Sequence, residues 1–322
     1  MQRSLFWLLD QYPETGESLP SLLATALGHA RLADQLGFSA LWIAEHHFHT
    51  LGTAANPAVV LAAMSQRTER LRLGPAVSVL PLRDPIQVAE DYALVDVLSS
   101  GRLNMGVGSG SRPNEFAGFG AEFECRRRVF DRNLDVLRQR WAAATAGERG
   151  PAALNVAPIQ SPAPRIYVAT NREDSAREIG RTGNSMLTLV SPQVSDLAEI
   201  KARIEAHRRG LKEAGHPDDS AEVVVVAFAH VGISEKEAKN VVAPALGRLI
   251  KFLAGVVPPE PTDLYDQMVE RGTGLFGTHS QVEQQIDRYA RLGVTHMAFV
   301  SRFGGIAPEL AQRNLRALAP SA

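Results

Sequence analysis

Short apolar runs alternate with longer amphipathic stretches along the chain, a pattern typical of repeated strand–helix units around a parallel sheet. Eight apolar runs bounded by Gly, Pro, Ser or Asp predict strands at residues 5–9, 40–44, 71–79, 103–107, 165–169, 186–190, 223–231 and 297–301. The stretches between them predict helices at residues 21–36, 57–67, 85–98, 123–145, 175–181, 194–214, 234–252 and 281–292, with a last helix at 308–318. The fold class that these elements predict is α/β.

This alternation suits a closed (β/α)8 barrel, or TIM barrel, of about 250 residues plus insertions. A doubly wound sheet would usually carry a nucleotide-binding fingerprint in its first turn, and the turn at residues 10–14 has none. No linker divides the chain, so we expect residues 1–322 to form one domain. Prolines and glycines gather near residues 147–164 and 253–277, which predict loop insertions of the kind that often cover a barrel's active site.

Composition and charge restrict the classes of partner. Of the 322 residues, 45% are hydrophobic and 21% are charged, as in ordinary soluble globular proteins, and the formal net charge is −1. Lysines and arginines are scattered, so neither nucleic acid nor a membrane is an expected partner. The one cysteine, Cys125, has no internal partner, and the residues after Met1 show no signal-peptide pattern, so we expect a cytoplasmic protein.

The densest group of ionisable side chains lies at residues 42–49, where the second predicted strand ends. The carboxyl ends of the strands form the catalytic face of a barrel, so these side chains are candidates for chemistry. Alternation along the strand puts His46 on one side and Glu45 with His47 on the other. Three histidines and a glutamate could also bind a metal ion. Alternatively, they could only form hydrogen bonds in a buried rim. No second ligand cluster follows another strand, so we expect no metal site.

Three further segments sit at predicted strand ends. Residues 106–112 form a glycine-rich turn with added hydroxyls and an arginine, which suits a bound phosphate or a plain tight turn. Residues 167–176 form a strand, a polar turn and a helix start, which suits a phosphate at the helix N-terminus or ordinary capping. Residues 77–81 suit a buried strand, or a backbone that approaches a flat aromatic ring.

Five strings of residues carry the strongest signal in the chain. They are Leu41-Trp42-Ile43-Ala44-Glu45-His46-His47-Phe48, Leu73-Gly74-Pro75-Ala76-Val77 with Leu80-Pro81, Asp84-Pro85-Ile86-Gln87-Val88-Ala89-Glu90-Asp91, Leu98-Ser99-Ser100-Gly101-Arg102-Leu103 and Gly106-Val107-Gly108. In this order and spacing, they resemble the bacterial-luciferase-like family of flavin-dependent monooxygenases. The likeness continues at residues 118–120, 164–175, 277–283 and 291–294, and so covers nearly the whole chain. No Gly-x-Ser-x-Gly elbow, P-loop or Cys-x-x-Cys pair supports another class.

The resemblance implies a barrel that binds reduced FMN at the carboxyl ends of its strands. There the C4a-peroxyflavin formed with O₂ would oxygenate a small organic substrate. A separate flavin reductase would supply the FMNH₂, because the chain carries no nicotinamide-binding fingerprint. His46 matches the family's active-site histidine, which implies a general acid/base role. Family members usually pair through their early helices, so a homodimer is expected.

The cofactor-binding residues implied by the resemblance lie on three turns. Ser109 stands where the luciferase subunit has a phosphate-binding arginine, so that contact is either lost or moved to Arg112. The turn at residues 170–174 also differs from the family's small Ser/Ala-rich loop, and Arg172 is the residue that would compensate there. The ring-binding segment is Ala76, Val77 and Ser78, and the phosphate-binding candidates are Gly108, Ser109, Arg112, Thr170, Asn171, Arg172 and Ser175.

The altered phosphate turns leave two alternatives open. One is a deazaflavin-dependent dehydrogenase of the same fold, and the other is a non-catalytic flavin-binding protein. The Glu-His-His-Phe string at residues 45–48 favours FMN over deazaflavin. The organic substrate depends on the pocket lining, which the sequence does not specify.

Overall fold

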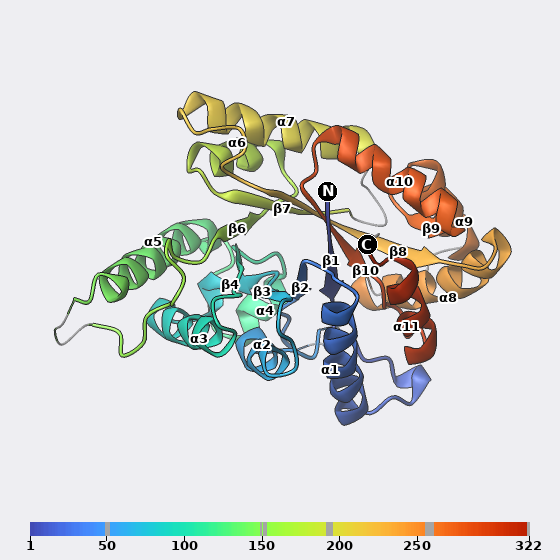
Figure 1. The fold of residues 1–322 in the computed structure, drawn as a ribbon, viewed down its shortest axis with the longest axis horizontal. Helices are drawn as coiled ribbons and strands as arrows, with labels where there is room; N and C mark the ends of the chain where they lie inside the picture. Colours follow the sequence, from blue (N-terminus) through green and yellow to red (C-terminus); the bar gives the residue numbers. More distant parts are fainter. Residues whose placement is uncertain (49–51, 149, 151–152, 191–195, 255–260, 321–322) are drawn as a thin grey trace.

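The computed structural model describes residues 1–48, 52–148, 150, 153–190, 196–254 and 261–320, and its helices surround a central sheet (Figure 1). The strands are β1 (Gln2–Trp7), β2 (Ala40–Ile43), β3 (Arg72–Pro75), β4 (Ser78–Val79), β5 (Met105–Gly108), β6 (Ile166–Ala169), β7 (Ser185–Leu189), β8 (Val223–Val231), β9 (Leu275–Gly277) and β10 (His296–Val300). The helices are α1 (Leu19–Gln35), α2 (Pro57–Ser65), α3 (Pro85–Leu98), α4 (Pro113–Gly118), α5 (Arg126–Thr145), α6 (Glu173–Arg181), α7 (Leu197–Glu213), α8 (Glu235–Ala254), α9 (Pro261–Glu270), α10 (His279–Leu292) and α11 (Pro308–Ala317), with short 3₁₀ turns at Pro13–Thr15 and Leu80–Leu82.

The described strands pair in parallel in the order β3-β2-β1-β10-β8-β7-β6-β5-β4, and β9 adds to the end of β8. Hydrogen bonds between Leu73 of β3 and the backbone of Arg102 and Asn104, just before β5, join the two ends of this order. Because β3 and β4 together occupy one strand position, the closed sheet has the eight strand positions of a (β/α)8 barrel. The predicted fold class is therefore confirmed.

Alternation along the strands produces two cores. In β2, Leu41 and Ile43 point outward to the helices, whereas Ala40 and Trp42 belong to the cluster inside the barrel. Trp42 is fully buried, and its ring meets that of Tyr167 edge-on at 4.9 Å. Side chains thus fill the barrel, which leaves its chemistry to the rim.

Helix α3 shows how local sequence sets an element boundary. The Asp84 carboxylate accepts hydrogen bonds from the backbone N–H groups of Ile86 and Gln87, and Pro85 occupies the first helical position. The observed helix has the predicted bounds, 85–98. Most other predicted elements are present with ends shifted by a few residues.

Two predicted elements need correction, and one helix was missed. The strand predicted at residues 71–79 is broken into β3 and β4, because the chain turns at Ala76 and Val77. The loop predicted at residues 253–277 contains α9 and β9 in its described part, and α9 begins at a proline, which suits a first helical position. The six-residue helix α4 was not predicted at all.

The described end of the insertion predicted at residues 147–164 lies away from the rim. Its Gln160 donates hydrogen bonds to Asp96 and to the Leu103 carbonyl, and it accepts one from Arg72 at the start of β3. These contacts lie at the amino ends of the strands, so the expectation that this insertion covers the active site is wrong for its described end.

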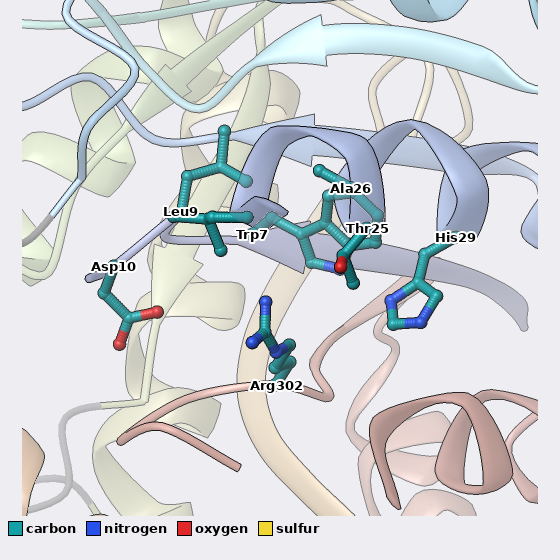
Figure 2. A pocket seen from close by; sticks show the side chains of 8 residues that line it. Trp7, Leu9, Asp10, Thr25, Ala26, His29 and Arg302 are labelled. Carbon is teal, nitrogen blue, oxygen red and sulfur yellow. The ribbon is translucent and has the colours of Figure 1, made fainter. Parts of the chain in front are cut away.

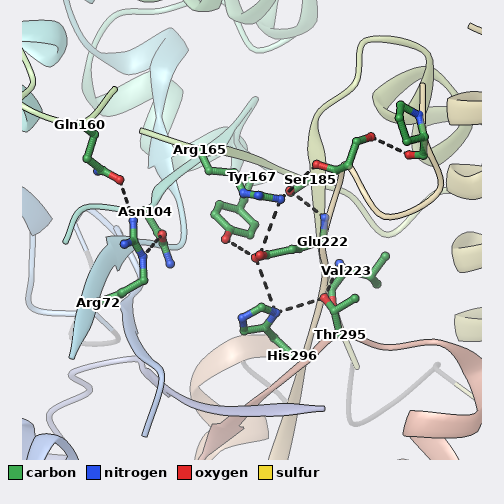
Figure 3. Close-up of polar contacts among 12 residues, drawn as sticks. Arg72, Asn104, Gln160, Arg165, Tyr167, Ser185, Glu222, Val223, Thr295 and His296 are labelled. Atoms are coloured by element: carbon green, nitrogen blue, oxygen red, sulfur yellow. Dashed lines mark hydrogen bonds and ion pairs between the residues drawn. The ribbon is translucent and has the colours of Figure 1, made fainter. Parts of the chain in front are cut away.

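A polar network closes the amino-terminal end of the barrel, the floor (Figure 3). The Tyr167 hydroxyl donates to Glu222 Oε2 at 2.5 Å, and His296 Nδ1 lies 3.6 Å from the same oxygen. Thr295 Oγ1 contacts His296 Nδ1 at 3.1 Å, and Arg72 donates to Asn104 Oδ1 at 2.7 Å. These part-buried contacts stabilise the amino-terminal end of the barrel, whereas the opposite end remains available for function.

Candidate active site

The predicted site segments all follow the carboxyl ends of neighbouring strands. His46 follows β2, Ala76 follows β3, Ser109 follows β5 and Thr170 follows β6. The pairs β2–β3, β4–β5 and β5–β6 are adjacent and parallel, so their ends meet on one rim. The fold thus gathers segments that lie more than a hundred residues apart in the sequence.

His46 forms the most direct link across this rim. Its Nδ1 atom lies 2.9 Å from Glu115 Oε1, and the backbone N–H of His47 donates to the same oxygen at 3.1 Å. Glu115 belongs to α4, beyond β5, and only 2% of it is exposed. Burial alone raises the pKa of this carboxyl, but the hydrogen bond and charge of His46, the His47 N–H and the charge of Arg112 together hold it below the usual value.

The other two ionisable groups of this segment form a separate pair. His47 Nε2 lies 3.1 Å from Glu45 Oε1, and Glu45 is buried. Tyr92 of α3 lies near this carboxylate, and burial, with the Glu45 charge as the next cause, raises the pKa of its hydroxyl. His46 therefore differs from Glu45 and His47 in its partner, as alternation along the strand predicts.

The ring-binding segment predicted by resemblance lies at the break between β3 and β4. The peptide bond between Ala76 and Val77 is cis. Ala76 is buried in the cluster inside the barrel, and the Ser78 hydroxyl is completely buried. Glycine is required on the neighbouring strand, because a Cβ at Gly106 would lie 2.1 Å from the Pro75 carbonyl oxygen and one at Gly108 would lie 2.6 Å from Val77 Cγ2.

The turn after β5 offers donors to an anion. Gly108 ends the strand, Gly110 has a left-handed φ of 76°, and Ser109 and Arg112 are half-buried. The Arg112 guanidinium makes no hydrogen bond or ion pair with another described residue, although its charge acts on Glu115. A half-buried arginine without a close counter-ion beside two hydroxyls and a glycine turn fits a phosphate group.

Polar groups in the turn after β6 already form hydrogen bonds with other groups of the protein. Asn171 Oδ1 accepts from Thr188 Oγ1 and from the Leu189 N–H, both at 3.0 Å, and Thr170 Oγ1 accepts from the Arg172 N–H. Arg172 pairs with Asp174 at 2.5 Å, and this hydrogen bond is the main cause that lowers the Asp174 pKa to about 2.

Other charges around the start of α6 are neutralised in the same way. Arg177 pairs with Glu213 and Arg209 pairs with Glu173, and the Ser175 N–H donates to Asp174 Oδ1. Two acidic residues in the first helical turn also use the positive end of the helix dipole. Of the two phosphate turns predicted, the one after β5 has the better donor set.

The cavity in Figure 2 lies outside the barrel, between β1, α1 and Arg302. Its volume is about 20 Å³, which suits one water molecule and is far too small for a flavin. Arg302 pairs with Glu17 at 2.6 Å, and burial, followed by the Arg302 charge, lowers the pKa of His29 to about 4. Neutral His29 and the paired arginine give this cavity a structural role.

Glu115 is the site residue that the sequence interpretation missed. It lies 69 positions from His46, and α4 is too short to show a helical period. An acid three residues after a glycine-rich turn and its arginine is the only local sign. Within the described residues, no group of three or more His, Cys, Asp or Glu side chains gathers in a way that could hold a metal ion.

Comparison with known proteins agrees with the barrel fold. The model of the luciferase-like monooxygenase family matches residues 1–296. The protein y4wF of Sinorhizobium fredii is 30% identical over 94% of this chain and 91% of its own. Limonene 1,2-monooxygenase of Rhodococcus erythropolis is 28% identical over 79% of this chain and 68% of its own.

Solved structures show the same fold. Monooxygenase RslO1 from Streptomyces bottropensis superposes with a TM-score of 0.88 at 26% identity, over 99% of this chain and 98% of that one. The oxygenating constituent of 3,6-diketocamphane monooxygenase of Pseudomonas putida, solved with FMN, superposes with a TM-score of 0.82 at 19% identity, over 99% and 96%. An F420-dependent secondary alcohol dehydrogenase gives 0.72 at 19% identity, over 98% of each chain.

No helix in the described part of the chain is long and apolar enough to cross a membrane. The family model covers every barrel strand except β10, of which it reaches only the first residue, together with every rim segment discussed above. The chain belongs to the luciferase-like monooxygenase family.

Proposed function

We propose that the protein is an FMN-dependent monooxygenase that uses reduced FMN and O₂ to oxygenate a small organic substrate. The observation that supports it most is the pairing of His46 with the buried carboxylate of Glu115 on the rim, next to a glycine turn with the uncompensated Arg112. A phosphorylated redox cofactor needs a group that transfers protons and a group that binds its phosphate. His46 would serve as the first and Arg112 as the second.

Each rim segment has a part in this proposal. Ser109 and Arg112, with the N–H groups of the glycine turn, would hold the FMN phosphate, and Ala76, Val77 and Ser78 would lie along its ring. Bound reduced FMN supplies the electrons that activate O₂. His46 holds or moves a proton at Nε2, the ring nitrogen that does not face Glu115, and the filled barrel excludes water from below.

Anaerobic titration of the purified protein with FMNH₂, and in parallel with reduced F420, tests this proposal. We expect saturable FMNH₂ binding and, after an oxygen pulse, slower oxidation of the flavin than in free solution. The substrates of related monooxygenases, such as limonene, provide the first panel for product formation. Binding of F420 alone would favour the deazaflavin-dependent dehydrogenase, which the structural neighbour of that type supports. Tight binding of oxidised FMN without oxygen consumption would favour a non-catalytic flavin-binding protein.

Replacing Arg112 by alanine should weaken FMNH₂ binding about 10- to 100-fold, the size expected for one charge-assisted contact with phosphate. Arg172→Ala should change binding by less than about threefold, because Asp174 already neutralises that guanidinium. Isothermal titration under anaerobic conditions measures both. Reduced riboflavin, which lacks the phosphate, should bind native protein and Arg112→Ala equally. A larger loss for Arg172→Ala would show that the phosphate lies at α6 instead.

A second copy of this chain is the proposed partner, and α2 and α3 carry its contact surface. On α3, Leu94, Val97 and Leu98 are 41–50% exposed at helical spacing, and Val59 of α2 is 65% exposed. The double variant Leu94→Glu/Leu98→Glu should convert a dimer into a folded monomer, measured by light scattering. Ile233→Glu, at an 80% exposed position before α8, should leave the dimer intact. Native protein that is monomeric at micromolar concentration would contradict this surface.

The flavin reductase is proposed as the source of FMNH₂. Chemically reduced FMN should therefore support turnover without any added protein, whereas NADH with oxidised FMN should not. Turnover with NADH and FMN alone would show that the chain reduces its own flavin.

A further inference from the structure

The contact between His46 and Glu115 is made by one particular nitrogen of the imidazole ring. Nδ1 lies 2.9 Å from Glu115 Oε1, whereas Nε2 makes no hydrogen bond with another described residue. The side chain of His46 is 21% exposed and that of Glu115 is 2% exposed. The carboxylate is therefore held inside the protein and the ring reaches out to the rim.

The ring is also supported from its other side. Gly52 has a left-handed φ of 72°, and a Cβ at this position would lie 2.8 Å from His46 Cβ and 2.9 Å from His46 Cδ2. The backbone at Gly52 thus packs directly against the ring. Together with the contact at Nδ1, this packing leaves the imidazole one orientation.

The charge on Glu115 decides which nitrogen carries the proton. The hydrogen bonds and positive charges around the carboxyl hold its pKa below the usual value despite burial, so it is ionised at neutral pH. An ionised carboxylate can only accept hydrogen bonds. Nδ1 must then be the donor, and a neutral His46 has its lone pair on Nε2.

We infer that Glu115 is a positioning residue that keeps His46 as the Nδ1–H tautomer and directs Nε2 toward the bound reactants. This inference rests on the proposed function for its effect on turnover, but the tautomer is a property of the protein alone. In the same way, a carboxylate that orients a histidine in hydrolases fixes which nitrogen accepts the proton. Glu115 acts through His46 and does not itself exchange a proton with substrate.

The tautomer is measured on the protein without flavin, by long-range ¹H–¹⁵N spectra of ¹⁵N-histidine-labelled protein at alkaline pH. His46 is assigned by the signal that His46→Asn removes. We expect a protonated Nδ1 and an unprotonated Nε2 in native protein. In Glu115→Ala the two nitrogens should show a mixture of tautomers, because the acceptor is gone.

Turnover supplies the second measurement. Glu115→Ala should lower kcat about 10- to 100-fold while the KM for FMNH₂ stays within about threefold, as expected when an orienting partner is lost. Glu115→Gln keeps an acceptor oxygen and loses the charge. Its proportion of the Nδ1–H tautomer and its kcat should both lie between those of native protein and of Glu115→Ala. Glu122→Ala, which removes an exposed acid seven positions away, is the matched control and should match native protein in the spectra.

The possible outcomes test the tautomer, the positioning role and the proposed function separately. A native His46 with an unprotonated Nδ1, or the same tautomer in Glu115→Ala, would overturn the inference whatever the activity. A changed tautomer with unchanged kcat would overturn the positioning role. Failure of the proposed function would instead appear in native protein, as absence of FMNH₂-dependent oxygen consumption, with the spectra unaffected. If Glu115→Ala fails to fold, Glu115→Gln gives the same comparison, since it preserves the volume of the side chain.

Discussion

Oxygenation of substrate should slow about 100-fold when His46 is replaced by asparagine, the loss expected when one general acid/base group is removed. Asparagine places an amide nitrogen close to the position of Nδ1, so the buried Glu115 carboxylate keeps a hydrogen-bond donor. The variant lacks any group at the position of Nε2. The fold and the binding of FMNH₂ should therefore survive while proton transfer is lost.

The measurement is the rate of product formation at saturating FMNH₂, with the substrate that the panel identifies. His279→Asn is the control, because the His279 side chain is 64% exposed at the start of α10 and faces Glu283 of the same helix. A His46→Asn enzyme with turnover within about twofold of native would remove His46 from the chemistry. His46→Ala should lose at least as much activity and some stability as well, since Glu115 then lacks its side-chain partner.

Gly210→Ala should destabilise the protein by about 3 kcal/mol, although alanine is the better helix former by about 1 kcal/mol. Helices α6 and α7 cross at Gly180 and Gly210. A Cβ at Gly210 would lie 2.0 Å from the Arg177 carbonyl oxygen, and one at Gly180 would lie 2.1 Å from the His207 carbonyl oxygen. Both obstacles are backbone atoms, so the helices would have to separate.

Gly28→Ala is the matched control for this experiment. Gly28 also lies inside a helix, α1, but a Cβ there would meet nothing within 4 Å. This variant should gain up to about 1 kcal/mol from helix propensity alone. Urea unfolding of both variants gives the comparison, and a Gly210→Ala protein as stable as native would mean that the two helices can move apart at little cost.

Local sequence was sufficient where an element depends on neighbouring residues. Asp84 and Pro85 define the start of α3, and the alternation after β2 separates His46 from Glu45 and His47. The barrel follows from repeated strand–helix units, each of which needs a partner for its apolar face. Resemblance then identified the rim segments as the place for a cofactor.

Other features depend on contacts between distant parts of the chain. The break between β3 and β4 lies where Pro75 and Val77 pack against Gly106 and Gly108, thirty residues later in the sequence. The partner of His46 is on α4, and no local pattern connects them. Arg112 and Arg172 differ because, among the described residues, only Arg172 forms an ion pair with a carboxylate, a contact that side-chain geometry determines.

The floor formed by Tyr167, Glu222 and His296 has a kinetic consequence. Because side chains fill the barrel above this floor, small molecules can enter and leave the site only through the rim. Two reactants that share the open rim cannot exchange places inside it, so whichever binds deeper must arrive before the other. Compulsory order of addition would then arise from a fixed plug at the far end of the barrel, without a moving gate.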